Sequence, residues 1–314
     1  MSRIVTVTLN PAIDQTVVLD TLAPGHVHRA RAVRRHAGGK GVNVACCLAD
    51  WGLPVTVIGL LGASNDAAFR EVFAMKGIED RFVRVPGETR TNLKLLDTGS
   101  GDTTDINLPG LPAGGTFEAA RCELLQTVER GSLVVLAGSL PDGIPSGAYA
   151  DLTAPLNAAG ARVVLDASGP ALAAVLTAAP DALPYAVKPN RHELEEWAGR
   201  SLPTLDAVRA AAEDLRRRGI PMVVVSLGAE GALFLDEAGA VHASPPPTEI
   251  ASTVGAGDAL VAGLVAALAA GLDLAATARL ALAFAAAKLT REGANLPPRP
   301  EVERIIETVR VSPV

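Results

Sequence analysis

The sequence predicts an α/β fold with a central, mostly parallel sheet flanked by helices and a small second sheet. Short runs rich in Val, Ile and Leu alternate with longer helix-compatible segments, which is the pattern of βαβ units. Residues 13–36 and 88–107 break this rhythm, because polar and apolar residues alternate there with no intervening helix. Such strands can be antiparallel and one-sided. We expect them to form an accessory sheet that projects from the main domain and closes over a ligand.

The strands of the main sheet are predicted from short apolar runs that end at polar or glycine-rich turns. The last run, residues 232–235, follows a glycine turn, and we expect it to run antiparallel to the other strands. The expected strands are residues 4–9, 55–61, 133–137, 162–166, 186–188, 222–226 and 232–235.

Helices are predicted in the longer segments between these strands. The most apolar one, residues 259–272, is shorter than the roughly 20 residues that a membrane-spanning helix requires, so we expect a buried core helix. The expected helices are residues 42–51, 67–76, 117–129, 149–159, 192–198, 206–218 and 259–272.

Composition excludes several classes of function. The chain is 49% hydrophobic and carries a net charge of −6, which argues against a nucleic-acid binder that works by neutralising phosphates. Cys46, Cys47 and Cys122 are an odd number without a CxxC spacing, so neither a disulfide framework nor a zinc site is indicated. The first residues read as a strand and not as a signal peptide. We expect a cytoplasmic protein with no membrane and no nucleic-acid partner.

The strongest motif is Gly255-Ala256-Gly257-Asp258, directly before the apolar helix. Glycines at a helix start let backbone N–H groups approach an anion, and the helix dipole adds positive potential there. Asp258, in the first turn, is placed to accept a proton from an attacking hydroxyl in phosphoryl transfer. The alternative is an aspartate that only caps a helix. The motif is not a Walker A loop, because no Gly-Lys-Ser/Thr follows.

A second glycine-rich turn, Gly38-Gly39-Lys40-Gly41, opens the helix that carries Asn43. Gly39 allows close approach of a ligand, Lys40 supplies positive charge for a phosphate, and Asn43 can hydrogen-bond sugar hydroxyls. A surface loop with a solvated lysine is the competing interpretation.

Polar residues of the two irregular stretches form a second group of candidates. Asp14 follows the first strand, at the edge where open α/β sheets bind ligands, although it also fits an ordinary turn. Arg90, Asn92 and Lys94 share one face of a strand because side chains alternate, and they suit a sugar phosphate unless that face is merely solvated. The polar segment 104–107, which ends at Asn107, is expected beside them.

Two further motifs follow strands of the main sheet. Asn190 and Glu193, three residues apart at a helix start, can share a Mg²⁺ through water, although this spacing is often just a helix cap. Ser226, Gly228 and Gly231 are expected in a tight turn beneath a nucleotide, unless they simply make a hairpin.

In this order, the motifs resemble the phosphofructokinase B group of the ribokinase family over residues 5–298. The resemblance implies one ribokinase-like kinase domain over residues 1–314, with a β-sheet lid that often serves as a dimer contact. It implies Asp258 as catalytic base and the backbone of Gly255, Ala256 and Gly257 as an anion hole beside ATP. It further implies Lys188, Ser226, Gly228 and Gly231 near ATP, and Asn190 and Glu193 near Mg²⁺.

Within that family, the chain most resembles bacterial members that phosphorylate the 6-hydroxyl of fructose 1-phosphate. This resemblance rests on Lys40 and on residues 89–95, 104–107 and 193–203. Kinases for tagatose 6-phosphate share the GGKG turn but match the 89–95 segment less, and 6-phosphofructokinases usually have glycine in place of Lys40. Ala259 departs from the family's usual serine, which leaves any hydroxyl contact there open. K⁺ is a further candidate cofactor, through carbonyls of Ser252 and Val254.

The resulting hypothesis is an ATP-dependent kinase that makes fructose 1,6-bisphosphate. Lys40, Arg90 and Lys94 are expected to hold the 1-phosphate while Asp14 and Asn43 fix sugar hydroxyls. A non-catalytic sugar-phosphate sensor is the alternative from another class, and the intact GAGD motif argues against it, since a sensor needs no base.

Overall fold

The computed structural model describes residues 2–113, 115–246, 255–291, 293 and 295–314, and its larger sheet has 11 strands. The bounds of these strands are β1 Ile4–Thr8, β4 Thr56–Gly62, β5 Glu79–Asp80, β6 Val83–Val85, β9 Leu133–Ala137, β10 Arg162–Asp166, β11 Ala186–Val187, β12 Met222–Ser226, β13 Ala232–Asp236, β14 Gly239–Ser244 and β15 Arg310–Pro313. Their order is β15-β14-β13-β12-β11-β10-β9-β1-β4-β5, with β6 paired to β4.

Most strand pairs in this sheet are parallel, as the sequence predicts. The pairs between β12 and β5 along this order are parallel, and the pairs β12–β13, β13–β14 and β14–β15 are antiparallel. The antiparallel orientation expected for residues 232–235 is therefore confirmed. Val, Ile and Leu dominate the central strands because both faces of the sheet are covered.

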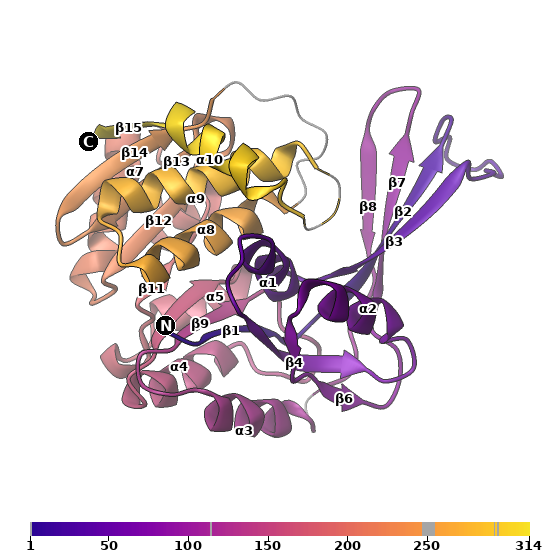
Figure 1. Cartoon of the computed structure of the whole chain (residues 1–314), viewed down its shortest axis with the longest axis horizontal. Coiled ribbons are helices and arrows are strands. Elements are labelled where there is room, and N and C mark those ends of the chain that lie inside the picture. Colours follow the sequence, from indigo (N-terminus) through magenta and orange to yellow (C-terminus); the bar gives the residue numbers. More distant parts are fainter. Residues whose placement is uncertain (1, 114, 247–254, 292, 294) are drawn as a thin grey trace.

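Helices cover the two faces of the large sheet (Figure 1). Helices α1, α2, α8, α9 and α10 pack into one apolar core, and α3 to α7 pack into the other. The bounds are α1 Lys40–Asp50, α2 Ala67–Lys76, α3 Phe117–Thr127, α4 Ala148–Ala158, α5 Gly169–Leu176, α6 Arg191–Ala198, α7 Leu205–Arg217, α8 Ala256–Ala270, α9 Leu274–Leu289 and α10 Arg299–Thr308, with short 3₁₀ turns η1 Pro180–Ala182 and η2 Gly228–Glu230.

A separate small sheet projects from the body of the molecule (Figure 1). It contains four strands in the order β3-β2-β7-β8, and we call it the lid sheet. Its strands are β2 Ala12–Leu19, β3 Ala32–Gly38, β7 Thr91–Asp97 and β8 Thr103–Asn107. The strands β2 and β7 pair in parallel, while the two outer pairs are antiparallel. The small second sheet that the sequence predicts is thus present.

The register of the lid sheet separates its two faces chemically. Asp14, His36, Asn92 and Asn107 stand opposite one another across the four strands, and Lys94 lies two residues along β7 on the same face. The other face is more apolar. It carries Val17, Val33, Leu93, Leu95 and Ile106.

The sequence prediction differs from the structure in several elements. The sequence does not predict the helices α5, α9 and α10 or the strands β5, β6, β14 and β15. Helix α8 begins at Ala256, three residues before its expected start, and α1 begins at Lys40 instead of residue 42. Both shifts place motif residues inside the first helical turn. Within the described residues, no helix is long and apolar enough to cross a membrane.

Candidate active site

The candidate site lies at the carboxyl ends of the parallel strands. The chain moves from β1 to β4 on one side and later returns to β9 on the other side of β1. Such a reversal of strand order opens a crevice where α/β proteins bind ligands. Asp166 ends β10 and Lys188 follows β11. Two helix N-termini, those of α1 and α8, lie at the same edge and bring Lys40 and Asp258.

The N-terminus of α8 has the geometry of an anion site. Gly255 adopts a left-handed conformation with φ of 82°, which only glycine adopts readily. Ala256, Gly257 and Asp258 form the first turn, where backbone N–H groups have no partner inside the helix. A side chain on Gly257 would begin 3.7 Å from the Lys188 ammonium. The first turn of α8 and a buried cation are therefore close together.

Asp258 is a buried carboxylate in this first turn, only 7% exposed. Its Oδ2 accepts a hydrogen bond of 2.7 Å from Asn43 Nδ2 of α1. Burial raises the pKa of Asp258 to about 6, and the negative charge of Asp166 adds to the rise. Asn43, Lys40 and Lys188 oppose it. A carboxylate with a pKa near 6 is well matched to proton abstraction at neutral pH.

Asp166 joins two lysines beside this carboxylate. Its Oδ1 lies 3.1 Å from Lys40 Nζ and 3.3 Å from Lys188 Nζ. Burial opposes the charge of Lys40, but Asp166 and Asp258 outweigh burial and raise its pKa. Asp166 Oδ2 is buried and has no hydrogen-bond partner among the described residues. Two cations thus face the N-terminus of α8, an arrangement suited to the phosphates of a nucleotide.

Sequence reasoning missed two charged residues here. Neither Asp166 nor Lys288 is among the site residues that the sequence predicts. Lys288 is 1% exposed, its Nζ donates to the Arg291 carbonyl at 2.8 Å, and its Cε lies 3.5 Å from where a Gly255 side chain would begin. Burial lowers the pKa of Lys288, which the charges of Cys47 and Asp258 oppose. A lysine inside the otherwise apolar stretch 280–289 of α9 was the available signal.

The polar face of the lid sheet gathers a second group of the predicted residues. Asn92 Nδ2 donates to Asp14 Oδ1 at 3.3 Å, and Lys94 Nζ lies 3.1 Å from Asp105 Oδ1. Burial raises the pKa of Asp14, while Lys94, Asn92 and Arg90 oppose the rise. Asn92 Oδ1 is buried without a hydrogen-bond partner among the described residues, so it is free to accept from a ligand hydroxyl. Asn107, opposite Asn92, is exposed.

Arg90 lies just before β7, where the lid sheet meets the large sheet. Its guanidinium donates to the carbonyls of Asn10 at 3.3 Å and of Pro11 and Leu108 at 3.4 Å. Burial lowers the pKa of Arg90, which the charge of Asp14 opposes. These long bonds to neutral carbonyls hold the guanidinium in place without neutralising it. Arg90 can therefore still bind an anion such as a phosphate.

The residues predicted to hold the 1-phosphate differ in their charged partners. The strongest interactions of Lys40 are with Asp166, Asp258 and Glu193, whereas Arg90 and Lys94 act on Asp14. Asn43 is bonded to Asp258. Gly39, the residue before α1, has φ of 112° and lies against Thr8 and Pro11, so its lack of a side chain has a packing reason.

The expected nucleotide turn follows β12. The Ser226 N–H donates to the Pro189 carbonyl at 3.0 Å, and Gly228 begins the 3₁₀ turn η2 with φ of 62°. A side chain on Gly231 would begin 2.0 Å from the Ala243 carbonyl oxygen. These glycines are therefore needed for the hairpin itself, and their contact with a nucleotide stays a prediction.

The two expected Mg²⁺ residues form a capping box at the start of α6. Asn190 Oδ1 accepts from the Glu193 N–H and Glu193 Oε2 accepts from the Asn190 N–H, both at 2.8 Å. Among the described residues, no group of three His, Cys, Asp or Glu could hold a metal. The donor set suits a Mg²⁺ that keeps several waters and binds nucleotide phosphates. Ser252 and Val254, the expected K⁺ residues, lie outside the described residues.

Comparisons with known proteins point to one family of kinases. The family described as pfkB family carbohydrate kinase matches residues 7–301. The chain is 54% identical to a 1-phosphofructokinase of Xanthomonas campestris pv. campestris, over 91% of this chain and 90% of that protein, and 50% identical to one of Rhodobacter capsulatus, over 98% and 97%.

Solved structures show the same fold. Phosphofructokinase-2 from Escherichia coli in complex with fructose-6-phosphate superposes with a TM-score of 0.90 at 30% identity, and covers 98% of this chain and 99% of its own. The same protein in complex with potassium gives a TM-score of 0.91 at 31% identity, with the same coverage. The chain belongs to the pfkB family of carbohydrate kinases.

Proposed function

We propose that this kinase transfers the γ-phosphoryl group of ATP to the 6-hydroxyl of fructose 1-phosphate and forms fructose 1,6-bisphosphate. The observation that carries the proposal is the buried Asp258, with a pKa raised to about 6, in the first turn of α8. Lys40 and Lys188 stand beside it. The choice of sugar is supported by relatives named 1-phosphofructokinase at 54% and 50% identity over nearly the whole chain.

In the proposed mechanism, O6 attacks the γ-phosphorus as the bond to the bridging oxygen of ADP breaks. Asn43 holds Asp258 Oδ2, so we assign the abstracted proton to Oδ1. The amides of Ala256 and Gly257 stabilise the charge on the transferring group, and Lys188 assists them. The amides need no reorganisation during the reaction because the helix holds them.

The sugar is proposed to bind between the lid sheet and the carboxyl edge of the large sheet. Arg90 and Lys94 would hold the 1-phosphate, and Asp14, Asn92 and Asn107 the hydroxyl groups. We assign Lys40 to the transferring phosphate, in place of the 1-phosphate. Its interaction with Asp258 supports this reassignment.

ATP is proposed to bind across Lys188, Ser226, Gly228 and Gly231. Mg²⁺ would neutralise its phosphates, held through water by Glu193 and Asn190. The charge interaction between Glu193 and Lys40 supports this placement. K⁺ is a further candidate because the structural neighbour was solved with potassium, and a comparison of rates in K⁺ and Na⁺ buffers tests it.

A homodimer through the lid sheet is proposed for the whole molecule. The lid face opposite Asp14 is the more apolar one, and Val33 and Ile106 on it are 52% and 43% exposed. The proposal treats residues 1–314 as one kinase domain with this lid. The Escherichia coli neighbour also has a tetrameric inhibited form. Finding an assembly larger than two chains would therefore contradict the proposed homodimer. The free thiols Cys46, Cys47 and Cys122 fit the expected cytoplasmic location.

The deciding experiment is ADP release from MgATP with fructose 1-phosphate, fructose 6-phosphate and tagatose 6-phosphate measured side by side. We expect the highest kcat/KM for fructose 1-phosphate. Preference for fructose 6-phosphate is the second candidate, because the neighbour with a TM-score of 0.90 was solved with that sugar. No turnover with any of the three would contradict the proposed function and favour a sensor.

A further inference from the structure

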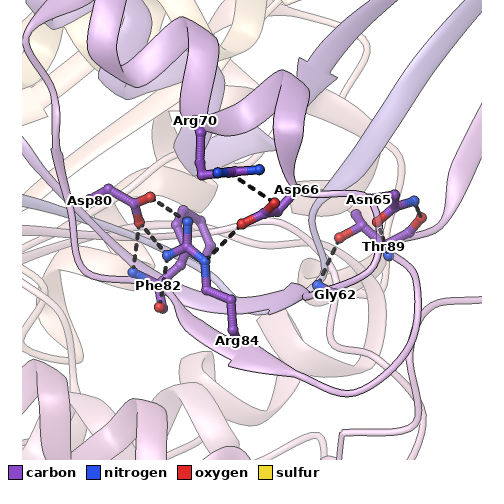
Figure 2. A network of polar contacts seen from close by, with 8 residues as sticks. All are labelled: Gly62, Asn65, Asp66, Arg70, Asp80, Phe82, Arg84 and Thr89. Carbon is purple, nitrogen blue, oxygen red and sulfur yellow. Dashed lines mark hydrogen bonds and ion pairs between the residues drawn. The ribbon is translucent and has the colours of Figure 1, made fainter.

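A cluster of hydrogen bonds fixes the point at which the chain enters the lid sheet. Thr89 is the residue before Arg90 and is only 2% exposed. Its neighbours across the junction are Gly62, the last residue of β4, and Asn65, which precedes α2. Figure 2 shows these three residues together at the end of β4. The proposed mechanism uses none of them.

Every polar group of Thr89 is bonded to the body of the protein. The Asn65 amide binds its backbone twice, with Oδ1 accepting from the Thr89 N–H at 2.7 Å and Nδ2 donating to the Thr89 carbonyl at 2.9 Å. The Thr89 hydroxyl oxygen accepts from the Gly62 N–H at 2.9 Å. A side chain on Gly62 would begin 2.2 Å from the Thr89 nitrogen. The two segments therefore touch at backbone distance and cannot slide past each other.

The residue next to Asn65 anchors this arrangement to the large sheet. Asp66 accepts from Arg70 at 3.0 Å on one oxygen and from Arg84 of β6 at 3.3 Å on the other. Arg84 in turn binds both carboxylate oxygens of Asp80, at 2.7 and 2.5 Å (Figure 2). A forked arginine–carboxylate pair is rigid as well as strong. Asn65 is thus presented from a fixed turn.

The contact continues directly into the candidate sugar-phosphate site. The Arg90 carbonyl accepts from the Ile13 N–H at 2.8 Å, the first bond between β2 and the start of β7. The Arg90 guanidinium reaches back to the Asn10 carbonyl beyond β1. Arg90 therefore lies between Thr89, which is held by hydrogen bonds, and the first hydrogen bonds between the strands of the lid sheet.

We propose that Asn65, Gly62 and Thr89 form the pivot of the lid sheet, and that Asn65 is a positioning residue that holds Arg90 for the phosphate of the sugar. The kinetic consequence rests on the proposed function of Arg90. The pivot itself rests only on the hydrogen bonds of Thr89. In the proposed binding mode Asn65 touches neither sugar nor ATP, so its effect on binding passes through the backbone of Thr89.

The test compares Asn65→Ala, Arg90→Ala and the double variant with Asn157→Ala as a matched control. Asn157 also binds two backbone groups, the carbonyls of Asp181 and Leu183 at 2.8 and 2.9 Å, on the far side of the large sheet. We expect Asn65→Ala to raise KM for fructose 1-phosphate about 10-fold, less than the roughly 10²-fold that a 1 Å misplacement can cause. KM for ATP should change less than twofold, and Asn157→Ala should leave both KM values unchanged.

The double variant separates positioning from general destabilisation. If Asn65 acts through Arg90, then Asn65→Ala has no further effect on KM for the sugar once Arg90 is alanine, because coupled residues are not additive. Additive effects, or equal increases of KM for sugar and ATP, would overturn the proposal. Equal effects of Asn65→Ala and Asn157→Ala would do the same.

Variants of Thr89 and hydrogen exchange test the pivot independently of the substrate. Thr89→Ser keeps the acceptor for Gly62 and should retain the wild-type KM, whereas Thr89→Val removes it at nearly constant shape and should behave like Asn65→Ala. In Asn65→Ala, amide exchange should accelerate at residues 86–97 and stay unchanged in α8. Unchanged exchange at 86–97 would disprove the pivot, whichever sugar phosphate the enzyme accepts.

Discussion

At the scale of single residues, the chemistry of this kinase depends on how burial and charge act on Asp258. The carboxylate lies in the first turn of α8, where the helix dipole favours its negative charge, yet burial and Asp166 raise its pKa to about 6. A base with this pKa is ionised at neutral pH and still able to take a proton. The two opposing effects on the pKa therefore give a side chain that is ionised at neutral pH and can still act as a base.

Replacing this base tests its role directly. Asp258→Asn keeps the shape and the contact to Asn43 but cannot accept the proton of O6. We expect kcat to fall by roughly 10²-fold or more, as for loss of a general base, with KM for ATP little changed. Asp206→Asn, an aspartate in the first turn of α7, is the control. A variant at position 258 that keeps wild-type kcat would exclude Asp258 as the base.

The pKa of Asp258 also predicts the pH dependence. Protonation removes the base, so kcat/KM for the sugar should fall about 10-fold per pH unit below about pH 6. Asn43 donates to the ionised form and lowers the pKa, so Asn43→Ala should move the acid limb to higher pH. A pH-rate profile of both proteins checks the sign. A shift to lower pH would contradict the contact.

Arg90 provides the test of sugar-phosphate binding. Arg90→Ala removes a half-buried cation that interacts with the charge of Asp14. We expect KM for fructose 1-phosphate to rise about 10-fold or more, since hydrogen bonds to charged groups contribute about 1.5–3 kcal/mol. Arg90→Lys should rescue only part of this, because a lysine lacks the planar fork that matches a phosphate. An unchanged KM for the sugar would place the phosphate elsewhere.

At the scale of elements, the strands were more predictable than the helices and edges. Runs such as 133–137 and 222–225 are apolar throughout because they are covered on both faces, and this pattern is visible in the sequence. Helix α9 is also almost uniformly apolar, so it shows no amphipathic stripe from which a helix could be inferred. The edge strand β15 pairs with β14 from about 70 residues earlier in the chain, and such distant pairing leaves no local signal.

The contact between α8 and α9 gives a prediction for stability. A side chain on Gly263 would begin 2.6 Å from the Ala281 Cα, and neither helix backbone can move easily. Gly263→Ala should therefore destabilise the protein by about 1–3 kcal/mol through overpacking, although alanine is the better helix former. Gly147→Ala, at a helix start with open space around it, should be neutral. Urea unfolding measures the free energy of unfolding of both variants. A Gly263→Ala variant more stable than the wild type would show that α9 shifts to make room for the methyl group.

At the scale of the whole molecule, the sequence could locate individual site residues but not the contacts between them. Motifs at helix starts located Lys40 and Asp258 because glycine turns and helix N-termini are local features. The bond between Asn43 and Asp258 spans 215 positions, and Asp166 meets two lysines from different elements. Residue types cannot reveal such contacts. The grouping of Lys40 with Arg90 around one phosphate stays a prediction.

The lid sheet gives the last prediction, which concerns assembly. Val33 and Ile106 lie on the lid face that points away from Asp14, on the two outer strands β3 and β8. Exposed apolar residues gathered on one face indicate a contact with another protein surface. If two lids pair through this face, then Val33→Glu with Ile106→Glu should convert dimers to monomers in sedimentation equilibrium, because buried unpaired charges are strongly unfavourable.

The matched control for this variant is Met75→Glu, which places a charge on an apolar side chain that is 76% exposed on α2. It should leave the mass unchanged. A monomeric wild type, or a double variant that remains dimeric, would exclude the lid contact. If dimers form through the lid, the monomeric variant should also show a higher KM for the sugar, because the sheet that contains β7, with Asn92 and Lys94, would lose the support of the partner lid.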